Sequence, residues 1–579
     1  MKNKYIILIT CILVSFTGCK KFIDVNHDPN RPVDVKESLI LAPVEAAISQ
    51  DITAAGNGNL ATVIQQYLQV IALNQLNPNQ GTYLLYNQDM DGDWYNYYVQ
   101  VMNNLVILNK KAEADGSANY AAVAKILIAY TLGSATDVWG DVPYSKAFGG
   151  IGNLAPTYDK QEQVYNELQT LLDGAIADIA KNQAATPGGD DYFYNGDMAK
   201  WKKLAYTLKA RFYMHLTKAP GHTAAAQAQL ALTALRNGMT SNDDDLKMPF
   251  SGAAGAENPW QQNFLPGSTL VLASTFVDGF KTRNDPRLPK MVAPAAETGL
   301  YTGRIIGTED IGSLESYSLG GPAYANADSY NYIVNYSEAL FLKAEATFIT
   351  TGVAAAQPVY ESAVKSHMSK MGISDANANT YLASRGALTA GNALQLIIEE
   401  KFIANFLSQE NYTAARYWLL QEHIARQETP AWQRLALAMG ENDQAAVERI
   451  LENEDDKISD FNKMEALRRL DRNEEALALT YSLLAAHKES ATTQTYLFNV
   501  RDDLIAKTSR QVTGGIEYKT LGNINFVESR ARFSLPYLRG ALWPRSSIIC
   551  SIQPNRESSC LRAMRWTSRR NTSVHGGKE

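Results

Sequence analysis

The sequence predicts a mainly α-helical protein whose helices pair as tetratricopeptide-like hairpins, with long irregular loops between them. Three observations predict this fold. Apolar residues recur at helical spacing in several windows, glycines stand where apolar stripes end, and polar stretches rich in Gly, Asn and Pro separate the stripes. Because each such helix buries one apolar face, successive helices joined by short turns are expected to pack against each other.

Four windows carry the clearest helical stripes. Asp159 and Glu162, three residues apart, predict a capping-box start with Asp159 as the N-cap of the second window. Gly352 separates the last two windows and predicts a tight turn between two facing helices. The windows are 122–130, 164–179, 339–346 and 360–368.

Long polar stretches separate these helices. Loops of this length in a compact protein are usually functional or contain small extra elements. Pro and Gly are spread through them, and none has the low complexity of a linker. They are 70–93, 184–198, 239–267 and 295–332.

Composition excludes several classes of protein. The 579 residues carry a net charge of −6, so nothing global indicates a nucleic-acid partner. Hydrophobic residues make up 45% of the chain and charged residues 20%, which is typical of globular proteins. Cys is absent between Cys19 and Cys550, which argues against a disulfide scaffold or a thiolate zinc site in the main body. The seven His lack metalloprotease spacing, and we expect neither a metal nor a cofactor.

The N-terminus predicts export and a lipid anchor. Lys2 and Lys4 precede an apolar run that is too short to span a bilayer but fits a signal peptide, residues 1–18. The run ends in small residues before Cys19, the pattern that a lipoprotein signal peptidase accepts. Acyl chains on Cys19 would hold the protein on a membrane, and the outer membrane is favoured because no Asp follows the Cys. The alternative is a plain secretory signal with an incidental Cys.

Seven strings together resemble one known family. In this order and spacing they resemble the SusD/RagB family of Bacteroidetes outer-membrane lipoproteins, over roughly residues 1–410. No single string is decisive, and the ordered set carries the resemblance. The strings are Phe22–Asn30, Thr136–Ser145, Tyr158–Tyr165, Tyr194–Asp197, Asn284–Pro289, Tyr336–Ala346 and Ile398–Phe406.

The resemblance implies a binding function. Members of this family are non-catalytic proteins that cover a SusC-like TonB-dependent outer-membrane transporter. They capture an oligosaccharide, or a peptide in the RagB branch, and deliver it to the transporter. The resemblance also implies a mostly helical fold with four tetratricopeptide-like hairpins that support an irregular ligand face, so residues 19–410 are expected to form a SusD-like domain.

Aromatic side chains on the polar loops are the candidate ligand-binding residues. Aromatic faces stack on sugar rings, and burial explains loop aromatics less readily than helical ones. Trp94 lies instead on a predicted helix, where it shares a face with Tyr98, and packing in the first hairpin is the alternative for it. The candidates are Tyr83, Tyr86, Trp94, Trp260, Tyr324 and Tyr332.

Two other chemistries are weighed and disfavoured. Asn87–Asp93 resembles the start of a calcium loop, but Tyr98 stands where a bidentate Glu is needed. We therefore interpret this segment as an Asp-rich turn into a helix. A surface glycoside hydrolase would need two carboxylates held at about 5–10 Å. Glu338 and Glu345 have a helical spacing, but charges on a hairpin helix explain them better, so no enzyme activity is expected.

After residue 410 the resemblance stops. Residues 411–506 are rich in Leu, Ala, Glu and Arg, with a loose 31-residue repeat between 435–445 and 466–476, close to the roughly 34 residues of a tetratricopeptide repeat. They weakly resemble exopolysaccharide-export proteins, which leaves a scaffold of polysaccharide export as an alternative. Residues 507–579 predict a short β-like stretch near 511–536 and then an aberrant basic tail. A true hybrid chain and a chimeric or frame-shifted one both remain open.

Overall fold

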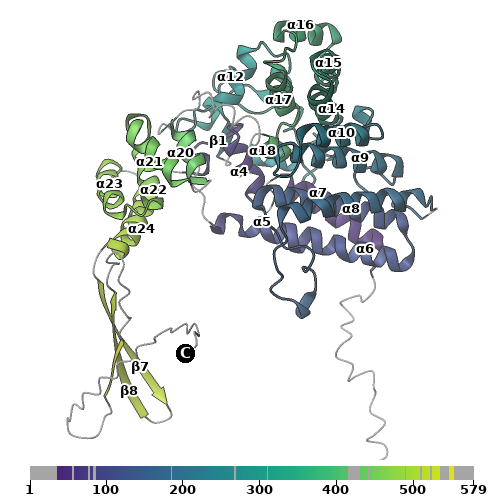
Figure 1. Cartoon of the computed structure of the whole chain (residues 1–579). Helices are drawn as coiled ribbons and strands as arrows, with labels where there is room; N and C mark the ends of the chain where they lie inside the picture. The colour runs from purple at the N-terminus through teal and green to yellow at the C-terminus, as the bar shows by residue number, and fades with distance from the viewer. Residues whose placement is uncertain are drawn as a thin grey trace, which may run out of the picture. The chain divides into compact units, whose positions relative to one another are not determined.

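The computed structural model divides the described residues into two compact units. Those up to residue 414 form the first unit, and those from 431 onward form the second (Figure 1). The predicted signal peptide 1–18 and Cys19 lie outside the described residues. The structure describes residues 35–54, 56, 58–75, 79–82, 87–183, 185–265, 269–308, 311–414, 431–440, 443–488, 491–508, 511–521, 524–534 and 547–552.

The first unit is mainly helical, and the predicted fold class is confirmed. Its longer helices are α3 (Glu37–Ala47), α4 (Leu60–Tyr67), α6 (Asn103–Asp115), α7 (Ala118–Trp139), α8 (Gln161–Ala180), α9 (Met198–His215), α10 (Ala224–Leu235), α14 (Tyr336–Thr351), α15 (Val353–Lys370), α16 (Asp375–Arg385) and α17 (Ala393–Ala404). Most of them pack on a neighbour in the chain: α6 on α7, α7 on α8, α8 on α9, α9 on α10, and α14 on α15 (Figure 1). Consecutive helices therefore pair as the apolar stripes predict.

Helix α7 forms the centre of this unit. Its residues Val123, Ile126 and Leu127 are fully buried, as the stripe at 122–130 predicts. The helix is long and apolar enough to cross a membrane by length and composition alone, yet 83% of its apolar window is buried inside the protein. Helices α6, α8 and α9 pack against it, so its apolarity is that of a core helix.

The start of α8 differs from the prediction by one residue. Lys160 is the N-cap, and its backbone N–H donates to Gln163 Oε1 at 3.1 Å. The Asp159 carboxylate accepts instead from the backbone N–H groups of Tyr144 (2.8 Å) and Ser145 (2.7 Å). The sequence predicted Asp159 as the cap. It does not show that the backbone of the preceding loop, at Tyr144 and Ser145, occupies the Asp159 carboxylate.

Short strands join loops that are far apart in the sequence. In the first unit, three antiparallel pairs form: β1 (Ile71–Leu73) with β3 (Leu270–Leu272), β2 (Leu246–Met248) with β6 (Asn331–Val334), and β4 (Val292–Ala293) with β5 (Leu319–Gly320). The β1–β3 pair places Leu73 opposite Leu270. It thereby brings the loop after α4 next to the loop that precedes β3.

The last described residues of the first unit are part of its core. Gln409 accepts from Tyr97 Oη at 2.8 Å, and Asn411 Nδ2 donates to the carbonyl oxygens of Phe402 (2.8 Å) and Asn405 (2.9 Å). Asn411 is fully buried. The first unit thus includes α18 (Glu410–Ala414), beyond the domain boundary expected at residue 410.

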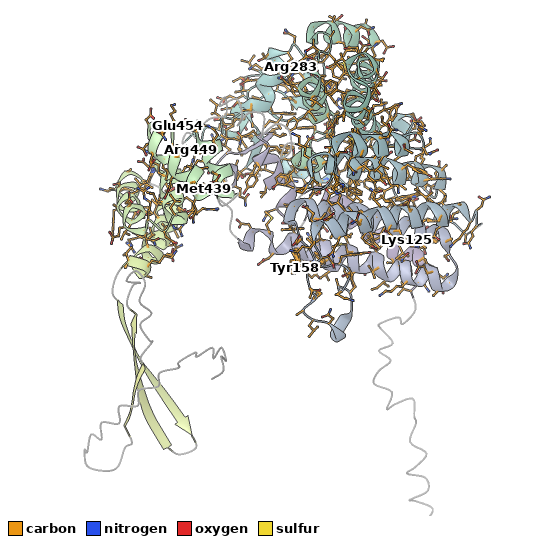
Figure 2. The ribbon with its side chains drawn as sticks, viewed as in Figure 1. Lys125, Tyr158, Arg283, Met439, Arg449 and Glu454 are labelled. Carbon is orange, nitrogen blue, oxygen red and sulfur yellow. The ribbon has the colours of Figure 1, made fainter. Side chains whose placement is uncertain are left out.

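The second unit contains helices followed by strands. The helices are α20 (Ala431–Gly440), α21 (Gln444–Asn453), α22 (Asp460–Arg469), α23 (Asn473–Ala486) and α24 (Ala491–Thr508). Within it, Leu435 and Ala466, which match in the loose repeat, lie in one apolar cluster. Glu454, labelled in Figure 2, pairs with Arg434. The strands β7 (Gln511–Leu521), β8 (Ile524–Ser534) and β9 (Ser547–Ile552) form an antiparallel sheet. The first two lie within the β-like stretch expected at 511–536, and β9 lies in the segment expected to be a basic tail.

Candidate functional site

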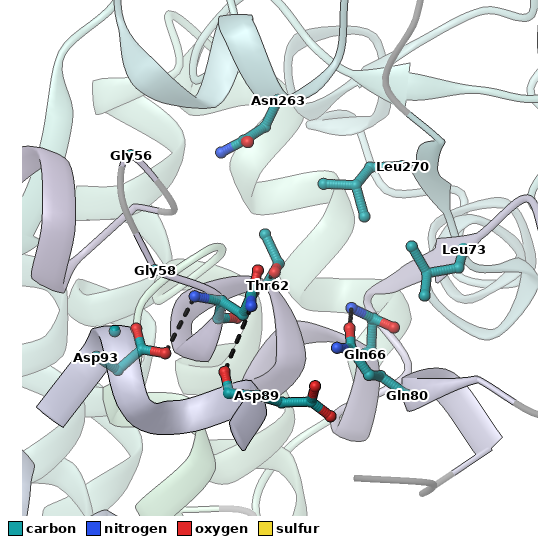
Figure 3. Close-up of a pocket in the computed structure, with 12 residues that line it drawn as sticks. Gly56, Gly58, Thr62, Gln66, Leu73, Gln80, Asp89, Asp93, Asn263 and Leu270 are labelled. Atoms are coloured by element: carbon teal, nitrogen blue, oxygen red, sulfur yellow. Dashed lines mark hydrogen bonds between the residues drawn. The ribbon is translucent and has the colours of Figure 1, made fainter. Parts of the chain in front are cut away.

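An open cavity of about 400 Å³ lies in the first unit, and its walls are mostly polar. A concave site with convergent polar groups is a candidate small-ligand site, and most such sites are more apolar than this one. Figure 3 shows the residues that line it around a central space. They are Gly56, Gly58, Asn59, Thr62, Gln66, Leu73, Gln80, Asp89, Gly92, Asp93, Asn263 and Leu270.

Several segments of the chain build this cavity, among them those that supply Gln80, Asp89 and Asp93. Helix α4 supplies Thr62 and Gln66, whose four-residue spacing puts both on one helix face. The β1–β3 pair supplies Leu73 and Leu270, which face each other as the apolar part of the wall. The short helix α11 (Pro259–Asn263) ends at Asn263, on the far side of the cavity from Thr62 in Figure 3.

Asp93 fixes the N-terminal end of α4. Its carboxylate oxygens accept from the backbone N–H groups of Asn59 and Leu60, each at 3.1 Å. A side chain in place of Gly58 would put its Cβ 2.1 Å from Asp93 Oδ1, so glycine is required for this close approach. Burial raises the pKa of the Asp93 carboxyl, and the two backbone donors partly oppose that effect. Asp93 therefore orders the wall.

Amide groups line the rest of the wall. Gln66 Nε2 donates to Gln80 Oε1 at 3.5 Å, and Asn59 Nδ2 donates to the carbonyl oxygen of Asp89 at 3.3 Å (Figure 3). Gln66 is fully buried, and its Oε1 has no hydrogen-bond partner among the described residues. A buried acceptor without a partner costs free energy, which a donor on a ligand would recover. The cavity can thus bind a hydroxyl-rich molecule.

The segment that resembles a calcium loop has another conformation. It forms the 3₁₀ turn η3 (Asn87–Met90) and the helix α5 (Asp91–Tyr95), which agrees with the predicted Asp-rich turn into a helix. Within the part of the chain that the structure describes, no group of three His, Cys, Asp or Glu side chains could hold a metal ion.

Tyr83 and Tyr86 lie outside the described residues. Gln80, three residues before Tyr83, and Asp89, three residues after Tyr86, both line the cavity. The ligand-binding role of the two tyrosines therefore stays a prediction. It is supported by nearby residues in the sequence that line the cavity.

Trp260 and Tyr324 are core residues in this structure. Trp260 is 1% exposed and Tyr324 is 4% exposed, within one apolar cluster. The Tyr324 ring meets Phe406 edge-on at 5.0 Å, and its hydroxyl lies 3.1 Å from His367 Nε2. Their position on polar loops predicted exposure, but the loops fold back over the helices and cover both rings.

Trp94 and Tyr332 are half-buried and do not line the cavity. Trp94 stacks on Tyr98 with 4.4 Å between ring centroids, as their shared helix face predicts. Its other stacking neighbour is Tyr158 at 6.4 Å, which is 62% exposed on the segment before α8 (Figure 2). Tyr332 lies under Lys370 Nζ, 4.8 Å from its ring centroid.

The polar residues of α4 were not among the candidates expected from the sequence. Gln65 and Gln66 are both fully buried, side by side in the sequence of a mainly apolar helix. A polar pair inside an apolar helix stripe is the signal that could have indicated them, because buried amides require partners.

Comparison with known proteins agrees with this fold. A family profile described as "Starch-binding associating with outer membrane" matches residues 29–414. Among solved structures, one described as a "chitin-binding protein" is 25% identical with a TM-score of 0.57, covering 66% of this chain and 86% of its own. A chitin-binding SusD homolog from Flavobacterium johnsoniae is 24% identical with a TM-score of 0.57, covering 66% of this chain and 86% of its own.

A further structure extends the same likeness. A SusD/RagB family protein from Bacteroides thetaiotaomicron is 20% identical with a TM-score of 0.57, covering 68% of this chain and 89% of its own. No functionally curated protein matches the chain. Because the family profile covers more than half of the sequence and includes the cavity residues, the chain belongs to the SusD/RagB family of SusD-like proteins.

Proposed function

We propose that this chain is a lipid-anchored protein of the outer membrane that binds a glycan and delivers it to a SusC-like TonB-dependent transporter. The open polar cavity of the first unit carries this proposal. Its amide, hydroxyl and carboxylate groups suit the hydroxyls of a sugar, and Leu73 and Leu270 offer apolar surface to a ring face. The family description and the chitin-binding relatives support a glycan as the ligand.

The geometry favours binding without bond cleavage. Glycoside hydrolysis uses an acid and a second carboxylate on opposite sides of the scissile bond. Among the described residues that line the cavity, Asp89 and Asp93 have carboxylates. Asp93 accepts from two backbone N–H groups at the start of α4, which gives it a structural role. Glu338, weighed above as half of a catalytic pair, is fully buried and bound by Arg211.

We test this proposal by measuring oligosaccharide binding and, in the same mixtures, the release of reducing ends. The purified mature chain is titrated with chitotetraose, maltotetraose and a tetrapeptide in a calorimeter, and each mixture is then assayed for new reducing ends. We expect saturable binding of an oligosaccharide and no release of reducing ends. Binding of the peptide alone would favour a peptide-uptake protein, and new reducing ends would contradict a purely binding function.

Lipid anchoring and association with the transporter are tested in the bacterium that makes the protein. We propose that Cys19 becomes the acylated N-terminus, so Cys19→Ala should move the protein from the outer-membrane fraction to the soluble fraction. Cys550→Ala is the matched control, since its position near the other end of the chain gives it no part in anchoring. Mild solubilisation of the envelope should recover the anchored protein with a TonB-dependent transporter. Recovery of Cys19→Ala in the membrane would contradict the anchor.

We also propose that the two units are separate parts of one chain, with the SusD-like domain first and a tetratricopeptide-like segment following it. The packing of α20 to α24 on their chain neighbours supports a helical repeat segment. Peptide mapping of the protein from its own cell envelope tests this arrangement. Peptides that cross residues 405–431 and reach the C-terminus would establish the hybrid chain, and a different sequence after about 414 would contradict it.

A further inference from the structure

The buried side chain of Gln409 connects two segments that support the cavity wall. Its Nε2 donates to the carbonyl oxygen of Ile52. Its Oε1 accepts from Tyr97 Oη at 2.8 Å and from Ser134 Oγ at 2.7 Å. Ile52 and Tyr97 belong to different parts of the chain, so a single amide fixes the distance between them.

The Ile52 segment leads directly into one side of the wall. Ile52 is the last residue of the short π-helix η1 (Ile48–Ile52). Gly58 and Asn59, which line the cavity, follow it closely in the sequence. Because a Cβ on Gly58 would lie 2.1 Å from Asp93 Oδ1, this side of the wall fits tightly against Asp93, and a shift of Ile52 would disturb that fit.

The Tyr97 segment carries the opposite side. Gly92 and Asp93 line the cavity from α5, and the π-helix η4 (Asn96–Met102) continues that helix with Tyr97 four residues after Asp93. Tyr97 is fully buried, and its hydroxyl also lies 2.8 Å from Ser134 Oγ on α7. The hydroxyls of Tyr97 and Ser134 and the Gln409 amide therefore form one hydrogen-bonded group at the core helix.

The residue before Gln409 supports the wall at a third point. Gln65 Nε2 donates to the carbonyl oxygen of Ser408 at 3.2 Å. Gln65 is fully buried on α4 and precedes Gln66, which lines the cavity. Ser408 and Gln409 thus bind the end of η1, α4 and η4, and each of these elements carries or adjoins lining residues.

We propose that Gln409 is a positioning residue of the ligand cavity, which holds the Gly58 and Asp93 sides of the wall at the separation that an oligosaccharide requires. This inference rests on the proposed glycan-binding function. Without the Gln409 amide, only a fraction of the molecules would have the wall in its binding geometry, and the apparent affinity would fall by that fraction. Loss of a buried hydrogen bond shifts such an equilibrium by about tenfold.

Gln409→Ala tests the proposal in the full mature chain. The variant and the wild type are titrated with chitotetraose and maltotetraose, and we expect about tenfold weaker binding by the variant. Asn119→Ala is the matched control, because it also removes a buried amide, which donates to the carbonyl oxygens of Gln183 at 3.1 Å and Ala185 at 3.0 Å and does not line the cavity. It should lower the stability but keep the wild-type affinity.

A second variant and a second measurement separate positioning from stability. Tyr97→Phe keeps the ring and removes one donor to Gln409, so it should weaken binding, and adding Gln409→Ala to it should weaken binding no further than Gln409→Ala alone. Hydrogen exchange is followed at the backbone N–H groups of Asn59 and Leu60, which donate to Asp93. Both should exchange faster in Gln409→Ala and at the wild-type rate in Asn119→Ala.

The possible failures are distinguishable. If Gln409→Ala binds as the wild type does, or if Asn119→Ala weakens binding equally, the positioning role is overturned while glycan binding stands. If Gln409→Ala does not fold, wild-type affinity of Tyr97→Phe overturns the role. If the wild type binds neither oligosaccharide, the proposed function is overturned, and unchanged exchange at Asn59 and Leu60 in Gln409→Ala separately overturns the positioning of the wall.

Discussion

The His215 imidazole lies between Glu410 and Tyr165 inside the first unit. Nε2 is 3.0 Å from Glu410 Oε1, and Nδ1 is 2.9 Å from Tyr165 Oη. Glu410 also lies 3.3 Å from Arg211 Nε, and all these side chains are buried. This cluster ties the last described helix of the first unit, α18, to α8 and α9.

The cluster predicts a pH-dependent stability. Burial alone would lower the pKa of the His215 imidazole, but the carboxylates of Glu410 and Asp137 outweigh it and raise the pKa above its ordinary value. Burial likewise opposes ionisation of Glu410, yet His215 and Arg211 lower the pKa of its carboxyl to about 2. The His215 contribution is complete below about pH 6.5 and is lost as pH rises through the folded-state pKa. The Glu410 contribution is present above about pH 4.3 and is lost as pH falls towards 2.

His215→Gln tests this dependence. The free energy of unfolding of the wild type should fall as pH rises above about 6.5, and the variant should lose most of that slope. Urea unfolding at pH 5, 6, 7 and 8 gives the slope. His222→Gln, on the half-buried turn before α10, is the control and should keep it. An equal slope in wild type and His215→Gln would contradict the role of this cluster.

Removing the charge of Glu338 should greatly lower the free energy of unfolding. Arg211 donates to it from Nε at 2.6 Å and from Nη2 at 2.7 Å, and Glu338 is fully buried. Removing one charge of a buried pair leaves the other without compensation, so Glu338→Gln should cost about 3–5 kcal/mol in urea unfolding. Asp278→Asn removes an exposed pair with Lys281 and should cost less than about 1 kcal/mol. Similar losses in the two variants would show that the Arg211 pair is not a stabilising element.

Gly58→Ala should disturb the cavity through its wall. A Cβ there would lie 2.1 Å from Asp93 Oδ1, so either the carboxylate or the start of α4 must shift. We expect a loss of about 1–3 kcal/mol in stability and weaker oligosaccharide binding, measured by urea unfolding and calorimetry. Gly391→Ala meets no atom within 4 Å and should change both by little. If Gly58→Ala binds the oligosaccharide as the wild type does, this wall is not part of the ligand site.

Tyr324→Phe separates packing from ligand binding. The hydroxyl lies 3.1 Å from His367 Nε2 in the core, and the variant keeps the ring. We expect a loss of about 1 kcal/mol in unfolding free energy with unchanged oligosaccharide affinity. Tyr192→Phe, on an exposed tyrosine, is the control for the loss of a hydroxyl. Weaker binding by Tyr324→Phe would support the prediction that Tyr324 binds the ligand.

Local patterns predicted the helices but not the cavity. The stripe at 164–179 lies in α8, and Gly352 separates α14 from α15, because periodicity and glycine turns act over a few residues. The cavity depends on the pairing of Leu73 with Leu270. These residues are far apart in the sequence, so no local pattern can predict that they pair. Trp260 shows the same difficulty, since its burial is set by distant segments that pack over its loop.

The central claim is that the cavity of the first unit binds a glycan, and Asn263 tests it most directly. Asn263 lines the cavity, whereas Asn166 lies exposed on α8 away from the lining residues. Each is changed to Ala, and both variants are titrated with the oligosaccharide that binds the wild type. We predict about tenfold weaker binding for Asn263→Ala, the loss of one hydrogen bond, and wild-type binding for Asn166→Ala. Equal affinity of both variants would contradict the claim.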